Sequence, residues 1–149
     1  MLFDLEDLMT QLGTAIAGRG IELKVDAKYD GIAFFDEQKL IRVFHNLTSN
    51  AVEAMPEGGS LHVVIGRDGE HLVFSVKDTG QGIPAKVHAR LFELFATGRK
   101  GGTGLGLAIV KRIVSDHHGT VSCDTGPTGT TFVIRLPLQR GADAAAEAV

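Results

Sequence analysis

The chain has 149 residues, of which 44% are hydrophobic and 22% are charged, and its formal net charge is −3. This length suits one domain with a hydrophobic core and is too short to expect two. The charge gives no electrostatic argument for a nucleic acid or an anionic membrane as partner, and no run of about 18 apolar residues predicts a membrane span. The single cysteine, Cys123, excludes an internal disulfide and is expected to pack as a small hydrophobic residue.

Apolar spacing predicts the elements of the first part of the chain. Residues 3–16 have helical spacing, and residues 21–25 alternate as a strand does after a break at 18–20. The short run 32–35 is another strand candidate. A longer helix is predicted from Asp36, a good N-cap residue, to about Met55. It carries one apolar stripe, formed by Leu40, Val43, Phe44, Leu47, Ala51 and Ala54.

A β-hairpin is predicted next, because residues 60–67 and 70–77 both alternate between apolar and polar side chains. Asp68-Gly69 between them is a strong signal for a hairpin turn. Pro84 suits the start of a short helix over residues 84–91. Residues 96–104 are rich in glycine and predict a loop.

The last part of the chain predicts a helix over residues 105–117, with Leu107, Val110 and Val114 on one face and Gly119 as its C-terminal stop. Residues 120–124 and 130–138 predict a final pair of strands. The expected fold is of the α+β class: a two-layer α/β sandwich, with a mixed, mostly antiparallel sheet covered on one face by about three helices. The domain is expected to span residues 1–138, with a disordered tail at 139–149.

The predicted strand that ends at Lys77 leads into Asp78-Thr79-Gly80-Gln81-Gly82. A carboxylate there can accept a hydrogen bond from the exocyclic amine of a purine, and the two glycines can leave room for the ring. Residues 80–85 formally fit the dinucleotide fingerprint G-x-G-x-x-A. A hairpin precedes them, however, and no acid lies near the expected ribose position, so this interpretation is rejected.

Two further stretches strengthen the nucleotide hypothesis. Asn46 and Asn50 lie one helical turn apart beside the apolar stripe, and their carbonyl oxygens suit Mg²⁺. The alternative is a pair of solvated residues, although asparagine is a poor helix former. Residues 100–107 carry glycines at alternate positions, 102, 104 and 106, and open into a helix, which predicts an anion site for phosphates. The alternative is a flexible linker, and a Walker A string is absent.

Together these stretches resemble the catalytic and ATP-binding domain of two-component sensor histidine kinases, in the superfamily of gyrase, heat-shock-protein-90, histidine-kinase and MutL ATPases. Residues 44–51 look like the N box, 78–82 like the G1 box, 92–95 like the F box and 102–107 like the G2 box. Residues 129–132 match the closing glycine-threonine signature. The resemblance covers Leu5 to Pro137 and implies the Bergerat-type ATPase fold.

The resemblance implies ATP and Mg²⁺ as cofactors and assigns roles to individual residues. Asp78 would accept from the adenine amino group, in a pocket shaped by Gly80, Gly82 and Ile83 and lined by Thr130. Asn50, with Asn46, would hold Mg²⁺. Residues 96–101 would form a lid anchored by Phe92 and Phe95, with Lys100 as a catalytic candidate that meets the phosphate charge. The triphosphate would be bounded by Gly102, Thr103, Gly104, Leu105, Gly106 and Leu107.

The implied activity is that of a cytoplasmic protein histidine kinase, which passes the γ-phosphoryl group of ATP to a histidine. Relatives that hydrolyse ATP carry a glutamate base where Asn46 stands, and an amide cannot activate water. None of the six histidines has the setting of the phosphoacceptor. The acceptor is therefore expected on a separate dimerisation and phosphotransfer helical hairpin, and a response-regulator receiver domain would follow it.

Two alternatives to this activity stay open. One is a serine kinase of the anti-sigma-factor type, and the other is a nucleotide-gated interaction module without catalysis. Many members of the resembled family also carry a lysine where Glu53 stands, so another basic residue must meet the phosphate charge here. The candidates are Lys100 and Arg99 in the lid, and also Arg42 and Lys39, for which a solvated surface charge is the favoured alternative.

Overall fold

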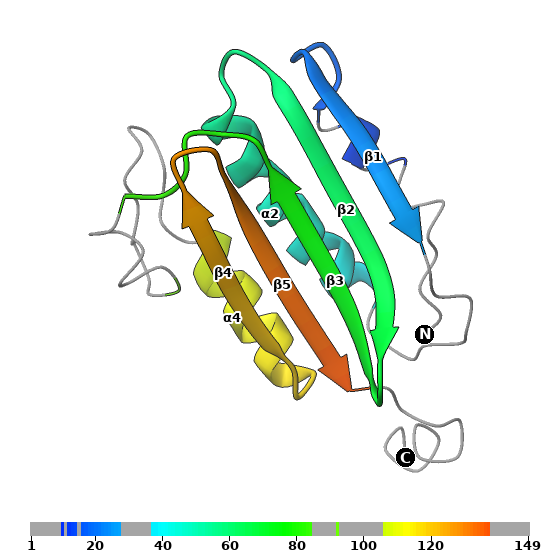
Figure 1. Cartoon of the computed structure of the whole chain (residues 1–149). Coiled ribbons are helices and arrows are strands. Elements are labelled where there is room, and N and C mark those ends of the chain that lie inside the picture. The colour runs from blue at the N-terminus through cyan, green and yellow to red at the C-terminus, as the bar shows by residue number, and fades with distance from the viewer. Residues whose placement is uncertain are drawn as a thin grey trace.

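The computed structural model describes residues 10, 12–14, 16–27, 37–84, 92 and 106–137. These residues form a five-stranded sheet in the order β1-β2-β3-β5-β4 (Figure 1). Strand β1 pairs with β2 in parallel, and the other neighbours are antiparallel. The predicted mixed, mostly antiparallel sheet is therefore confirmed. The elements are β1 (Ile21–Ala27), α2 (Glu37–Ala54), β2 (Gly59–Asp68), β3 (His71–Asp78), α4 (Gly106–Asp116), β4 (Thr120–Gly126) and β5 (Gly129–Pro137).

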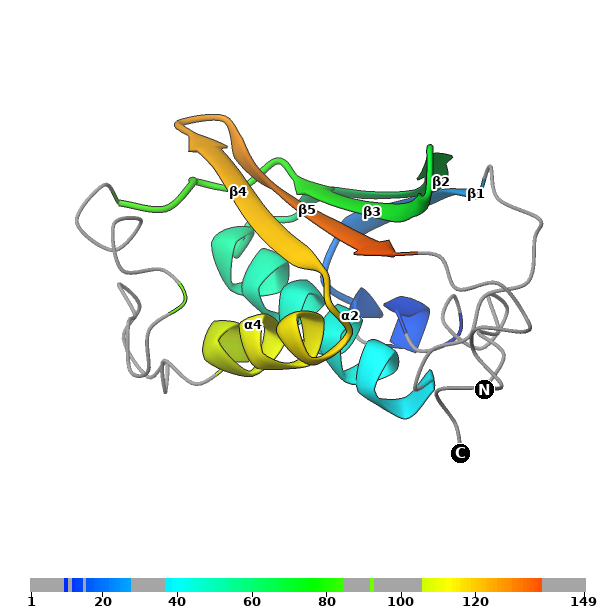
Figure 2. The ribbon, with the colours of Figure 1, turned by 90° about the horizontal axis from the view of Figure 1, so that it is seen from below.

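Helices α2 and α4 lie side by side on one face of the sheet, which gives the predicted two layers (Figure 2). Residues 10, 12–14 and 16 are also helical and lie on the same side of the sheet. Leu12 and Ile16 from this stretch are buried in the core. The N-terminal helix predicted over residues 3–16 is confirmed for these residues, and residues 3–9 lie outside the described ones.

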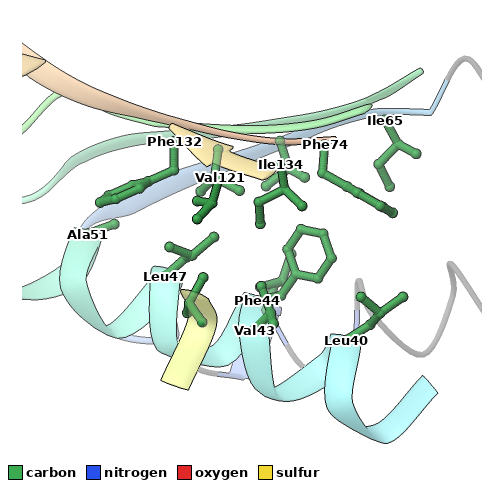
Figure 3. Close-up of a cluster of buried hydrophobic side chains, with 14 of the residues drawn as sticks. Leu40, Val43, Phe44, Leu47, Ala51, Ile65, Phe74, Val121, Phe132 and Ile134 are labelled. Carbon is green, nitrogen blue, oxygen red and sulfur yellow. The ribbon is translucent and has the colours of Figure 1, made fainter. Parts of the chain in front are cut away.

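The core lies between α2 and the inner face of the sheet, as Figure 3 shows. All six residues of the predicted stripe on α2 are buried. Phe44 of this stripe meets Phe74 of β3 edge to face, with ring centroids 5.0 Å apart. Helix α4 adds Val110, Ile113 and Val114. The helical period of α2 and the twofold alternation of the strands thus point their apolar side chains into one layer.

The β2–β3 hairpin differs by one residue from the prediction. Asp68 is still paired, with His71, so the two-residue loop is Gly69-Glu70 rather than Asp68-Gly69. Gly69 has a φ of +60°, which suits the first loop position of a type II′ turn. Asp68 stays in the strand, where its carboxylate accepts a hydrogen bond from Arg135 Nη2 at 2.9 Å.

The C-terminus of α4 also corrects the prediction. The residue in the left-handed conformation is His118, with a φ of 62°, and not Gly119. The His118 N–H donates to Ser115 O and the Gly119 N–H to Val114 O, both at 2.9 Å, which is the Schellman arrangement. Gly119 is needed for another reason: a Cβ there would collide with the Arg135 carbonyl oxygen and with Leu136.

Several predicted segments lie outside the described residues: the strand at 32–35, the N-cap Asp36, residues 85–91 of the short helix, the loop at 96–104 and the tail at 139–149. The predicted final strands are confirmed, with a loop at residues 127–128 between them. No helix within the described ranges is long and apolar enough to cross a bilayer.

Candidate functional site

Asp78 is the last residue of β3 and is only 4% exposed. It sits between two strands, opposite Leu61 of β2 and Thr130 of β5. Its Oδ1 accepts a hydrogen bond from the Gly80 N–H at 2.9 Å, so the carboxylate orders the loop that follows it. An ionised carboxylate has about four acceptor positions. Asp78 therefore keeps acceptor capacity for a ligand donor beyond the bond to its own loop.

The loop after Asp78 is held against α2 on one side. The Gln81 N–H donates to Ala54 O, at the C-terminal end of α2, at 3.2 Å. A Cβ on Gly80 would lie 2.5 Å from the same Ala54 oxygen. The Thr79 hydroxyl adds a link to β2, because it accepts from the Ser60 N–H at 3.0 Å.

On its other side the loop meets the β4–β5 hairpin. Gly82 has a φ of +80°, and a Cβ there would collide with the carbonyl oxygen of Gly126. The sequence hypothesis was that Gly80 and Gly82 leave room for a ring. The structure gives a different reason for both glycines, since the atoms that a Cβ would meet belong to the protein's own chain.

Thr125 joins this loop to β5. The Ile83 N–H donates to Thr125 Oγ1 at 2.8 Å, and the same oxygen lies 2.8 Å from Thr130 Oγ1. Thr130 is 3% exposed and stands opposite Asp78. Ile83 and Thr130 are predicted site residues, whereas Thr125 is not. Only the β4–β5 register, which pairs Thr125 with Thr130, reveals it.

Cys123 lies two residues before Thr125 on β4 and is half-buried. Burial raises the pKa of its thiol from 9.0 to about 12, and the negative charges of Asp124 and Asp78 add to the effect. The thiol is therefore protonated at neutral pH. This fits the expected packed residue better than a nucleophile, which would need a thiolate.

Asn46 connects α2 to α4. Its Nδ2 donates to the carbonyl oxygen of Gly106, the first residue of α4, at 3.2 Å. This bond fixes the orientation of the amide, whose oxygen is its only atom able to bind a cation. Asn50 lies one turn further along α2 and is partly buried.

The donor chemistry here fits Mg²⁺ in a nucleotide complex. No cluster of three or more His, Cys, Asp or Glu side chains that could hold a metal occurs among the described residues. A few amide oxygens combined with phosphate oxygens and water are a set that Mg²⁺ accepts, because this ion retains several waters and rarely sits in an all-protein cage.

The described site residues gather at one end of the molecule. The end of β3, the β4–β5 hairpin and the C-terminal end of α2 lie together there, and α4 begins toward the same end, against the middle of α2 (Figure 1). Phe92, from the stretch that resembles the F box, packs edge to face on Phe132, with centroids 6.5 Å apart. Leu107 is partly buried against the core. Six predicted site residues lie outside the described ranges: Phe95, Lys100, Gly102, Thr103, Gly104 and Leu105.

Known proteins match this chain in sequence. The family model described as histidine kinase-, DNA gyrase B-, and HSP90-like ATPase matches residues 35–140. Sporulation kinase A of Bacillus subtilis (strain 168) is 41% identical over 120 residues, which are 79% of this chain and 20% of that protein. The C4-dicarboxylate transport sensor protein DctB of Rhizobium meliloti (strain 1021) is 39% identical over 134 residues, 88% of this chain and 22% of the relative. The chain thus spans about a fifth of the length of these relatives.

Solved structures match the fold. The mycobacterial sensor histidine kinase MprB superposes with a TM-score of 0.81 at 31% identity, over 93% of this chain and 97% of that one. Full-length ShkA in complex with AMPPNP also superposes with a TM-score of 0.81, at 30% identity, over 95% of this chain and 31% of that one. The predicted fold and family are therefore confirmed, and membership of an ATPase family implies that the chain binds ATP. The chain belongs to the histidine kinase-, DNA gyrase B- and HSP90-like ATPases, and its relatives within that family are sensor histidine kinases.

Proposed function

We propose that this domain binds Mg²⁺–ATP and passes the γ-phosphoryl group to a histidine on a separate dimerisation and phosphotransfer hairpin, for relay to an aspartate of a response-regulator receiver domain. The observation that supports this most is the pairing of a buried acid, Asp78, with Thr130, and its bond to the Gly80 N–H. The start of α4, which the Asn46 amide contacts, lies toward the same end of the fold (Figure 1). The Asp78 carboxylate, which can accept from an adenine, and the Asn46 side-chain oxygen, which can bind a metal ion, thus lie toward the same end of the fold.

At the adenine end, the Asp78 carboxylate accepts from the 6-amino group. A hydrogen bond with one charged partner contributes about 1.5–3 kcal/mol. The loop that carries Gly80, Gly82 and Ile83 is fixed in advance by α2 and by the β4–β5 hairpin. Little conformational freedom is therefore lost at this end when the base binds.

At the phosphate end, Asn50 and the Asn46 oxygen would hold Mg²⁺, which when bound neutralises phosphate charge. The N-terminus of α4 favours anions because its first N–H groups lack partners within the helix. From the family resemblance, we assign Gly102, Thr103, Gly104 and Leu105 to the triphosphate and Lys100 to its charge, with Phe95 beside Phe92 at the base of the lid.

The chain's own contribution to the reaction is positioning and charge neutralisation rather than covalent chemistry. Asn46 has no basic group with which to activate water, which favours transfer to a protein acceptor over hydrolysis. We also propose that the catalytic domain spans residues 1–138, acts in the cytoplasm, and contacts neither nucleic acid nor membrane directly.

The test is a transfer assay that uses γ-labelled ATP, Mg²⁺, this chain and a separate histidine-bearing helical hairpin. We expect label on the hairpin that is lost in acid and stable in alkali, as the phosphoramidate bond of phosphohistidine requires. Asn50→Ala should slow the transfer strongly even at saturating ATP, and a hairpin without its histidine should stay unlabelled. Label on serine would instead favour the serine kinase, and ATP binding without transfer would favour the nucleotide-gated module.

A further inference from the structure

The hydroxyl of Thr125 lies between two parts of the proposed adenine pocket. It accepts from the Ile83 backbone at 2.8 Å and contacts the Thr130 hydroxyl at 2.8 Å. It also lies 3.2 Å from the position that a Cβ on Gly82 would occupy. One side chain thus fixes both the loop that follows Asp78 and the threonine that faces Asp78.

Two arrangements of the hydrogens are possible for these two hydroxyls, because either oxygen can be the donor. Each hydroxyl has one hydrogen and two lone pairs, and the Ile83 N–H occupies one lone pair of Thr125. If Thr130 donates to Thr125, the remaining hydrogen belongs to Thr125, which is only partly buried. If Thr125 donates to Thr130, the remaining hydrogen belongs to the buried Thr130 and is available to a ligand beside Asp78.

The second arrangement matches the edge of adenine. That edge presents an amino donor beside the ring acceptor N1, whereas guanine presents an acceptor beside an N–H donor. Asp78 and Thr130 are register partners on β3 and β5, so a carboxylate acceptor and a hydroxyl donor lie next to each other. This pair is complementary to adenine and mismatched to guanine.

We propose that Thr125 is a positioning residue of the adenine pocket: it clamps the loop at Ile83 and donates to Thr130, which turns the Thr130 hydrogen toward the ring acceptor N1. This proposal rests on the proposed function, in which ATP binds with its amino group at Asp78. Thr125 itself does not touch the base.

The experiment measures the affinity of the full chain for ATP and for 1-deaza-ATP, in which a C–H replaces N1, by titration calorimetry. Loss of one hydrogen bond predicts that Thr125→Val weakens ATP binding about fivefold to tenfold. The same variant should weaken 1-deaza-ATP binding by a clearly smaller factor, because the N1 contact is already missing there and only the support of the loop at Ile83 is lost. Thr125→Ser keeps the hydroxyl and should bind both nucleotides like the wild type.

Thr120→Val is the matched control, since Thr120 is exposed on the same strand and its substitution should change neither affinity. Equal weakening for both nucleotides would mean that Thr125 only supports the loop, and an unchanged ATP affinity would give it no role. Either result overturns the proposal. If the wild type binds ATP and Asp78→Asn weakens binding while Thr125→Val does not, this inference fails and the proposed function stands. If the wild type does not bind ATP, both fail.

Discussion

Replacement of Asp78 by asparagine tests the adenine end of the site most directly. The Gly80 N–H donates to Oδ1 of the carboxylate at 2.9 Å. The other carboxylate oxygen, Oδ2, is proposed to accept from the adenine amine. An asparagine has one oxygen and one NH₂ in these two places. If the oxygen stays with Gly80, the NH₂ faces the amine, and if the amide flips, the NH₂ faces the Gly80 N–H. One donor is opposed by another donor in either case.

The expected loss is that of a charge-assisted hydrogen bond, about 1.5–3 kcal/mol, which is roughly 10- to 150-fold in Kd for ATP. Titration calorimetry with Mg²⁺–ATP measures it, and thermal unfolding of the nucleotide-free variant checks that the fold persists. Asp68→Asn is the control, because Asp68 is an exposed carboxylate whose partner is Arg135. An Asp78→Asn variant that folds and binds ATP like the wild type would refute the assignment of Asp78 to the adenine.

Three further predictions concern packing, backbone conformation and protonation. Gly82→Ala should destabilise the chain more than Gly69→Ala in chemical denaturation: both have positive φ, which costs about 1–2 kcal/mol for alanine, but only Gly82 has a backbone oxygen in the way. An equal loss of unfolding free energy in the two variants would contradict the role of the Gly126 oxygen. His118→Gly should stabilise the chain by about 0.5–1 kcal/mol, because glycine avoids the left-handed penalty at a φ of 62°; a lower midpoint of unfolding would refute this. Because the folded state raises the pKa of Cys123 from 9.0 to about 12, the stability linked to its protonated thiol is present below pH 9 and lost as the pH rises toward 12. Iodoacetamide should accordingly react slowly with the native chain at pH 8 and quickly with the unfolded chain, and Cys123→Ser should remove this pH dependence.

Local patterns were sufficient to predict the layers and most of the elements. The stripe on α2 and the alternation of β2 and β3 each follow from the period of one element, and the structure confirms both. The errors occurred where two local signals competed within one or two residues. Asp68-Gly69 satisfied the composition rule for a turn, yet cross-strand pairing moved the loop by one residue. Gly119 has the composition of a helix stop, but a glycine is needed there because a Cβ would collide with β5.

The contacts that organise the site were beyond the reach of the sequence because they join distant segments. The Asn46 side chain bonds to Gly106, 60 residues away, and Ile83 bonds to Thr125, 42 residues away. The family resemblance named one or both partners in each case. It could not indicate that the Asn46 nitrogen is committed to α4, or that an unnamed threonine holds the loop.

The two ends of the proposed site should have different kinetic signatures. The adenine ring is distant from the reacting phosphorus, so its contact with Asp78 is equally strong before and during phosphoryl transfer. Such uniform binding lowers KM without raising kcat. Asp78→Asn should therefore raise the KM for ATP and leave kcat within about twofold. Asn50 is proposed to act on the phosphate and metal, where charge is redistributed during transfer, so Asn50→Ala should lower kcat even at saturating ATP. Steady-state transfer to the histidine hairpin over a range of ATP concentrations separates the two effects. A pure kcat loss for Asp78→Asn, or a pure KM change for Asn50→Ala, would show that the two ends have been assigned the wrong way round.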